Sequence, residues 1–223
     1  MYFVGYSTLI LRVKVMELIS IQFAPNRETR EFINTAEFAC LEETCRFAIN
    51  ILDEDRQLLS VSVAERCIAI AQYFHLSGSD IIRLEIAARV HRVGELFLEN
   101  SLRGKCFLDM TSREMRAYRH YPIFSALRFS QYINRGLYEI LLTHREYYSS
   151  AGCTDRESDE KIPLSARILC VATEYEELVM YRGSDVIKLD TIQRRMMKNS
   201  VGRYDPEVVS ALMLTIASES VSH

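Results

Sequence analysis

The stretch that decides the fold is "RLEIAARVHRVGEL", residues 83–96. Its apolar residues recur at intervals of three and four, which predicts a helix with one buried face. His91 lies at the edge of this face, and Arg92 follows it directly. A buried histidine is a common metal ligand, whereas a guanidinium has no lone pair to donate and repels a metal cation. The stretch therefore raises the question of whether this helix carries a metal site.

Composition places the chain among ordinary soluble globular proteins. Hydrophobic residues make up 48% of its 223 residues and charged residues 26%, which suits one large domain, or one domain with a modest N-terminal addition. Only four prolines and eight glycines favour a helix-rich chain. The net charge of −3 and the lack of a basic run argue against general nucleic-acid binding.

The N-terminal residues and the cysteines indicate a cytoplasmic protein. The six cysteines show no framework spacing and fall mostly in apolar helical runs, as reduced cysteines do. Residues 1–23 are apolar but are interrupted by Arg12, Lys14 and Glu17, so we expect neither a signal peptide nor a membrane span. Their partial alternation and β-branching favour one or two strands.

From about residue 28 onward the pattern predicts helices only. Two pairs have the spacing of a capping box, Ser77 with Asp80 and Thr111 with Glu114. Pro122 predicts a kink or an early break within its helix, and Asp205 followed by Pro206 predicts a helix start. The other expected helices cover about 27–52, 62–74, 137–148 and 164–182.

Three histidines, His91, His120 and His144, lie on different predicted helices at the boundary between apolar and polar faces. Metal sites in helical bundles are built in this way, from side chains of several helices that converge on one point. A single histidine on a helix is nevertheless more often a packed or surface residue. The three histidines alone are therefore a weak signal.

The order of several motifs resembles the HD-GYP family, a subgroup of the HD metal-dependent phosphohydrolases that acts on cyclic di-GMP. The similar stretches are "VAERCIAIAQYFHLS" (63–77), "RLEIAARVHRVGEL" (83–96), "MTSREMRAYRHYPIFSAL" (110–127), "IPLSARILCVATEYEEL" (162–178) and "GRYDPEVVSAL" (202–212). The first ends like the family's L-G-L-S, with a histidine, His75, at the glycine position.

The resemblance implies an all-α HD-type helical bundle with a short N-terminal β or irregular extension. We expect the extension in residues 1–55 and the HD-GYP-like domain in residues 56–223. It also implies bacterial, cytoplasmic signalling.

The chain departs from the family where the chemistry should lie. In the segment that resembles L-H-D-I-G-K, His91 is kept, but Arg92 holds the position of the aspartate and Glu95 that of the lysine. The family's first ligand histidine falls at about Leu59, and its last metal-binding aspartate falls at Thr173.

In "THREYYSSAGC", residues 143–153, one histidine of the family's double-histidine is lost, and Ala151, Gly152 and Cys153 replace its Gly-Tyr-Pro signature. Of the ligands that the resemblance implies, His91, His120 and His144 remain.

A binuclear site needs the bridging carboxylate that Arg92 replaces. Three histidines could still hold a single Zn²⁺ or Fe/Mn ion, with Glu95 as a further ligand four residues after His91. The favoured alternative is that no cofactor binds, that Arg92 and Glu95 form an ion pair and that hydrogen bonds satisfy the histidines. An Arg92 side chain that points between the histidines would exclude a binuclear centre.

Arginines near the expected site suggest a second reading. Arg92, Arg145 and Arg182 could hold a phosphate without hydrolysing it, because guanidinium groups bind phosphate in a bidentate manner.

We therefore predict a signalling or interaction module with no catalytic residues and no phosphodiesterase activity. It would bind a protein partner, and a homodimer is an option. The alternatives are a mononuclear phosphohydrolase and a non-hydrolysing sensor of cyclic di-GMP.

Overall fold

The computed structural model describes residues 52–103, 105–130, 135–146, 148, 162–181, 189–200 and 202–221. All of them belong to one of the two compact units of the chain, Cys45–His223. Every regular element in these ranges is helical, and they contain no strand, which confirms the all-α prediction. The strands expected in residues 1–23 lie outside the described residues.

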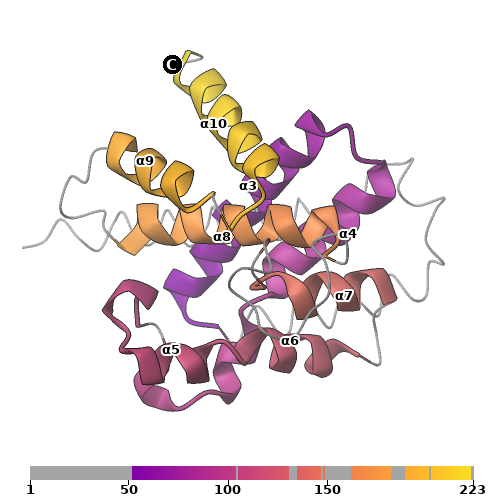
Figure 1. Cartoon of the computed structure of the whole chain (residues 1–223). Helices are drawn as coiled ribbons and strands as arrows, with labels where there is room; N and C mark the ends of the chain where they lie inside the picture. The colour runs from indigo at the N-terminus through magenta and orange to yellow at the C-terminus, as the bar shows by residue number, and fades with distance from the viewer. Residues whose placement is uncertain are drawn as a thin grey trace, which may run out of the picture. The chain divides into compact units, whose positions relative to one another are not determined.

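The helices surround α8, which runs through the middle of the bundle (Figure 1). Their bounds are α3 Glu54–Tyr73, α4 Gly78–Val90, α5 Ser112–Tyr118, α6 Tyr121–Phe129, α7 Arg135–Thr143, α8 Leu164–Tyr181, α9 Leu189–Asn199 and α10 Pro206–Val221, with a 3₁₀ helix, η2, at Val93–Phe97. Helix α8 packs against α3, α4, α7, α9 and α10. No helix in the described ranges has the length and apolarity needed to cross a membrane.

Three helix boundaries predicted from local signals are confirmed. The Ser77 side chain accepts a hydrogen bond from the backbone N–H of Asp80 at the start of α4, and Thr111 and Glu114 form a complete capping box on α5. Pro122 lies in the first turn of α6, where its missing N–H costs no hydrogen bond, and the break falls just before it.

Three helices differ from the sequence prediction. Helix α7 ends at Thr143, not near residue 148. Helix α3 begins at Glu54, not near residue 62. This earlier start was not predicted because the buried Arg56 and Ser60 interrupt the apolar pattern of the first turns. The expected domain boundary at residue 55 therefore falls in the first turn of α3. Helix α9 was not predicted; among its described side chains, only Ile192 and Met196 are buried.

The end of α3 shows why a glycine would suit the position that His75 holds in this chain. His75 donates its N–H to Gln72 and Leu76 donates to Ala71, the two hydrogen bonds of a Schellman motif. The φ of His75 is 52°, in the left-handed region that glycine adopts without strain. The turn is therefore kept although the residue that suits it is absent.

Candidate functional site

Two of the three predicted histidines meet in the core. His91 is the C-cap of α4, and His144 follows the last residue of α7. Both side chains are completely buried, and their ring centroids lie 5.5 Å apart with the rings nearly perpendicular. The contact between α4 and α7 therefore brings together residues that are far apart in the sequence.

Both nitrogens of the His91 ring have protein partners. Nδ1 lies 2.6 Å from the carbonyl oxygen of Ala88 and donates to it, so Nε2 is the acceptor nitrogen of the neutral ring. Nε2 faces the Thr173 hydroxyl at 3.3 Å. Burial lowers the pKa of His91 well below its ordinary value, and the neighbouring His144 and Arg92 lower it further. His91 is therefore neutral near pH 7.

His144 has the same arrangement. Its Nδ1 donates to the carbonyl oxygen of Leu141 at 2.8 Å, and its Nε2 accepts from the Tyr121 hydroxyl at 3.1 Å. Burial, with help from Arg145 and Arg92, lowers the pKa of His144 to about 3. A hydroxyl thus occupies, in each histidine, the lone pair that a metal would need.

The third histidine does not join the pair. His120 is exposed in the turn between α5 and α6, where its Nδ1 lies 3.2 Å from the carbonyl oxygen of Ala117. Leu59, the approximate position of the family's first ligand, is buried in the apolar face of α3. Within the described ranges, no three His, Cys, Asp or Glu side chains are arranged to hold a metal ion.

Arg92 is enclosed in the core beside the two histidines, with 1% of its side chain exposed. It pairs with Glu95 at 2.6 Å and with Glu177, and it donates to the Tyr118 hydroxyl at 3.3 Å. The Tyr118 hydroxyl in turn donates to Glu95 at 2.7 Å. Burial opposes the charge of Arg92, but its partners outweigh burial and raise its pKa well above the ordinary value. The predicted Arg92–Glu95 ion pair is confirmed.

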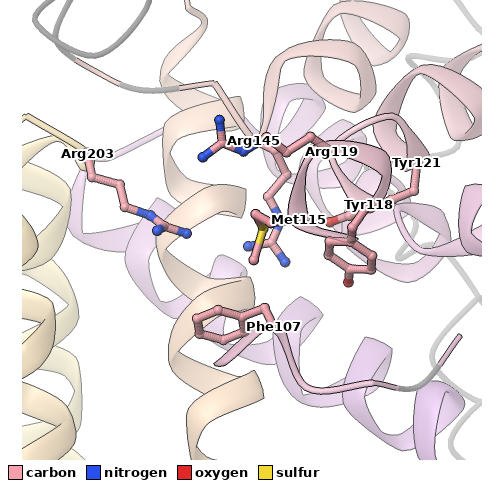
Figure 2. A pocket seen from close by; sticks show the side chains of 7 residues that line it. All are labelled: Phe107, Met115, Tyr118, Arg119, Tyr121, Arg145 and Arg203. Carbon is pink, nitrogen blue, oxygen red and sulfur yellow. Dashed lines mark hydrogen bonds between the residues drawn. The ribbon is translucent and has the colours of Figure 1, made fainter. Parts of the chain in front are cut away.

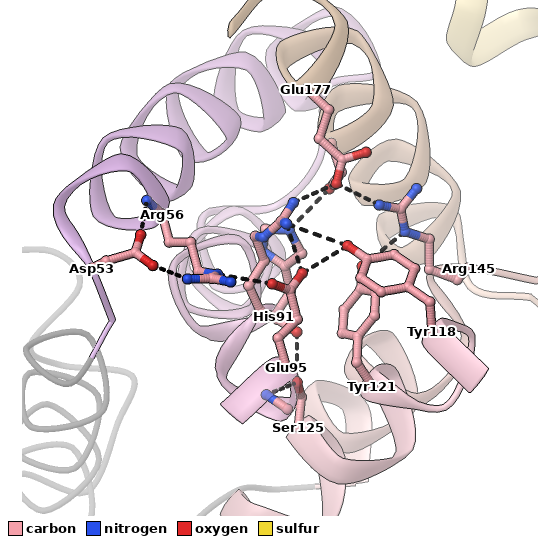
Figure 3. Close-up of polar contacts among 12 residues, drawn as sticks. Asp53, Arg56, His91, Glu95, Tyr118, Tyr121, Ser125, Arg145 and Glu177 are labelled. Carbon is pink, nitrogen blue, oxygen red and sulfur yellow. Dashed lines mark hydrogen bonds and ion pairs between the residues drawn. The ribbon is translucent and has the colours of Figure 1, made fainter. Parts of the chain in front are cut away.

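These ion pairs extend into a chain of alternating charge, which we call the ionic chain. Figure 3 shows the part of it from Asp53 to Arg145. Its members in order are Asp53, Arg56, Glu95, Arg92, Glu177, Arg145, Glu174 and Arg203. The middle of the ionic chain is buried, and its two ends reach the surface. It links α3, η2 and α8 with the segments that follow α7 and precede α10.

These residues do not fit a binuclear metal centre. The positions that the resemblance assigns to aspartate ligands hold Arg92 and Thr173, and Arg92 brings a permanent positive charge into the core. Glu95, considered as an additional ligand, has its carboxylate engaged by Arg56 at 2.9 Å and by Arg92. The donor set therefore lacks the carboxylates that hold two cations together.

The three arginines expected to bind phosphate have different surroundings. Arg92 is enclosed by carboxylates, and Arg182 lies outside the described residues. Arg145 pairs with Glu177 at 2.7 Å, yet it also lines a small pocket. Glu177 was not among the predicted site residues. In "TEYEEL", residues 173–178, Glu177 lies at the alanine of the family's D-x-F-D-A-L pattern. This departure was a signal, because a buried arginine requires a buried carboxylate.

The pocket lies next to the ionic chain (Figure 2). Its lining residues are Phe107, Met115, Tyr118, Arg119, Tyr121, Arg145 and Arg203. Figure 2 shows three guanidinium groups around one space, with the Phe107 ring on the other side of it. None of these described lining residues is acidic. Burial raises the pKa of Tyr121 to about 12, so its hydroxyl stays protonated near neutral pH.

Comparison with known proteins agrees with the all-α HD-type fold. The family model described as HD domain matches residues 29–208. The chain is 28% identical over 148 residues to the cyclic di-GMP phosphodiesterase response regulator RpfG of Xanthomonas campestris, covering 65% of this chain and 39% of that protein. It is 23% identical over 168 residues to the cyclic di-GMP phosphodiesterase PdeB of Borreliella burgdorferi, covering 71% and 42%.

A third relative is the 3′3′-cGAMP-specific phosphodiesterase 2 of Vibrio cholerae, 24% identical over 155 residues, with 68% of this chain and 30% of that protein covered. Among solved structures, Bd1817, a HDG"Y"P protein from Bdellovibrio bacteriovorus, superposes with a TM-score of 0.59 at 16% identity, covering 89% of this chain and 66% of that one. The chain spans less than half the length of each of these three sequence relatives.

Proposed function

The chain belongs to the HD domain family, and from this premise we propose that its HD-GYP-like domain is catalytically inactive and serves cyclic di-GMP signalling by binding a protein partner. One observation carries the proposal: Arg92, buried between Glu95 and Glu177, stands where the resemblance places the metal-bridging aspartate. The names of the relatives, cyclic di-GMP phosphodiesterases among them, support the signalling context.

Electrostatics supports the loss of activity. A hydrolytic pair of metals lowers the pKa of a bridging water and neutralises the phosphodiester, and carboxylates must hold the two cations together. A guanidinium supplies a positive charge but cannot bind a water as a Lewis acid does. Arg92 therefore replaces the charge of a metal without replacing its chemistry.

The mononuclear alternative has a narrower basis. His91 and His144 are neutral and present Nε2 as the acceptor nitrogen, the form in which histidine binds a metal. A metal on this pair would have to displace the hydroxyls of Thr173 and Tyr121 and would lie beside the charge of Arg92. We therefore rank this alternative second.

The test measures metal content and cyclic di-GMP hydrolysis in the wild-type chain and in the variant Arg92→Asp/Thr173→Asp/Glu177→Ala. This variant returns two aspartates and one alanine to the positions of the family pattern. We expect the wild type, purified without chelator, to hold less than about a tenth of an equivalent of transition metal and to show no hydrolysis. We expect the variant to gain metal, because its carboxylates can bind a cation.

Arg113→Asp is the matched control, because it makes the same charge change at an exposed position on α5. It should leave the metal content at the wild-type level. About one equivalent in the wild type, lost in His144→Ala, would favour the mononuclear site instead. Cyclic di-GMP hydrolysis by the wild type would refute the proposal.

A further inference from the structure

We propose that the surface formed by Phe97, Ile123 and Leu127, with the arginines around it, is the docking site for an acidic amphipathic helix of a partner protein. We call it the α6 surface. The proposal rests on the partner-binding role proposed above and assigns that role to one face of the molecule. This face is separate from the histidine pair, because the α6 side chains that contact the pair, Tyr121 and Ser125, are buried on the other side of the helix.

Three large apolar side chains are exposed at the centre of the α6 surface. Phe97 is the last residue of η2 and is 56% exposed, and Ile123 and Leu127 lie one turn apart on α6 and are 40% and 54% exposed. The ring of Phe124 links them, because its centroid lies 6.1 Å from that of Phe97 and it precedes Leu127 by three residues. The apolar side chains are therefore contiguous, as is typical of an interaction site.

Arginines surround this apolar centre. Arg103 donates to the carbonyl oxygens of the two residues that flank Phe97, at 2.6 and 3.0 Å, which holds it beside that ring. Arg128 is exposed in the last turn of α6, and Arg113 and Arg116 are exposed on α5, which leads into α6 through a two-residue turn (Figure 1). Among the residues that the structure describes, no carboxylate pairs with Arg113, Arg116 or Arg128. A partner can therefore reach these charges.

The charge of this region is opposite to that of the whole chain. Residues 96–130 contain six lysines and arginines against three acidic residues, whereas the chain as a whole has a net charge of −3. One of the three acidic residues, Glu114, is engaged by Lys105 at 2.7 Å. Two copies of the chain that met through this surface would bring their arginines together, which is unfavourable. Charge complementarity therefore favours an acidic partner over a second copy.

The composition of the surface favours a protein helix over a lipid surface. An apolar centre with a polar rim is typical of protein interfaces, in which arginine is enriched and lysine is depleted. Ile123 and Leu127 form a row along α6, and a partner helix packed along this row can present apolar side chains at the same spacing. Acidic residues beside the apolar row of the partner would then meet the arginines of the rim.

Two synthetic helical peptides of about 18 residues test the proposal, with binding to the full chain measured by fluorescence anisotropy. Both carry leucines at intervals of three and four residues. One has glutamates on both sides of the leucine row, and the other has lysines there. We expect the glutamate peptide to bind saturably and the lysine peptide to bind at least about tenfold more weakly. Raising the salt concentration from about 50 to 300 mM should weaken binding of the glutamate peptide, because salt screens the arginines.

Leu127→Ser should raise the Kd of the glutamate peptide at least about fivefold, because it removes an apolar contact at the centre of the surface. Leu214→Ser is the matched control, because Leu214 is 53% exposed on α10, outside the α6 surface, and it should leave the Kd unchanged. Arg128→Glu should weaken the glutamate peptide and strengthen the lysine peptide. Lys198→Glu, at an exposed position on α9, should do neither. Circular dichroism checks that the variants fold.

The proposal is overturned if the glutamate peptide does not bind saturably at about millimolar concentration, if the two peptides bind equally, or if Leu127→Ser and Leu214→Ser have equal effects. Tighter binding to vesicles of phosphatidylcholine and phosphatidylserine than to the glutamate peptide, reduced by Leu127→Ser, would assign the surface to an anionic membrane and also overturn it. Cyclic di-GMP hydrolysis, measured on the same preparation, tests the function proposed above separately. Without hydrolysis, a failure of peptide binding would refute the α6 surface alone.

Discussion

Arg92 forms ion pairs at the position where the resemblance places a metal-bridging aspartate. Relative to the family pattern, the signs at positions 92 and 95 are reversed together, and a glutamate appears at position 177. The pair of opposite charges between 92 and 95 is thereby kept with its direction inverted, and Glu177 supplies the additional negative charge. The charge of the buried Arg92 guanidinium is therefore compensated by two buried carboxylates.

We predict that Arg92→Met lowers the free energy of unfolding by about 3–5 kcal/mol, because it leaves Glu177 and Glu95 buried with one cation fewer. Combining it with Glu177→Leu should recover part of this loss, since replacing a buried pair by apolar side chains removes the uncompensated charge. A double-mutant cycle in urea measures the coupling. Strictly additive losses would contradict the prediction.

The exposed pair Arg135–Glu139 on α7 is the control for this cycle. Its charges lie one helical turn apart at the surface, where water screens them. Its coupling should be much smaller than that of Arg92 and Glu177.

Much of the site at this scale could be predicted from local spacing. The ion pair between positions 92 and 95 follows from three-residue spacing in the chain. The partnership of Arg92 with Glu177 spans 85 positions, and it depends on how α8 packs against α4. The exclusion of His120 could not be predicted either, because it depends on where α5 and α6 separate and which way their turn faces.

At the scale of elements, η2 and α6 approach each other so closely that the contact requires glycine. A Cβ on Gly94 would lie 2.0 Å from the carbonyl oxygen of Tyr121 and 2.6 Å from the backbone nitrogen of Ser125. The N–H of Gly94 also donates to the Ser125 hydroxyl at 2.8 Å, and that hydroxyl donates to the carbonyl oxygen of His91. The position of His91 is therefore tied to α6.

We predict that Gly94→Ala lowers the free energy of unfolding by about 2–3 kcal/mol, because the new methyl group meets rigid backbone. Gly78→Ala is the matched control, since a Cβ there has nothing within 4 Å. It should stay within about 1 kcal/mol of the wild type. Urea denaturation followed by circular dichroism measures both variants, and similar stabilities would refute the packing argument.

The helices themselves were largely predictable because their ends carry local signals. The caps at Ser77 and Thr111 and the break at Pro122 each depend on a few neighbouring residues. The start of α3 was missed because its buried Arg56 is polar and pairs with Glu95, 39 positions away. Sequence periodicity assumes that buried residues are apolar, and the ionic chain breaks that assumption.

At the scale of the whole molecule, the two buried histidines predict how stability depends on pH. The pKa of His144 is about 3 in the folded chain and near its ordinary 6.5 in the unfolded chain. His91 shifts in the same direction. Between these values the unfolded chain binds more protons, so the free energy of unfolding falls as the pH drops from about 6.5 toward 3.

We predict that each of these histidines makes the free energy of unfolding fall with decreasing pH. Below pH 6 the contribution of each histidine to this slope approaches about 1.4 kcal/mol per pH unit. His144→Gln should therefore reduce the slope between pH 6 and 5 by about that amount, although the variant is less stable at pH 7.5. Urea midpoints measured at several pH values give both slopes. Parallel curves for the wild type and His144→Gln would show that His144 does not remain neutral in the folded chain.

The alternation of charge along the ionic chain also constrains how such a protein can evolve. An aspartate returned to position 92 alone would face Glu95 and Glu177, and Arg56 and Arg145 would be the nearest cations left to compensate them. Each charge is thus favourable only beside the charges of its neighbours. The effect of a substitution at one position therefore depends on the residues at the others, which is epistasis. Any mutational path between this core and a metal-binding one must change several positions together or cross a less stable intermediate. The ionic chain therefore favours keeping Arg92 as long as the charges around it are kept.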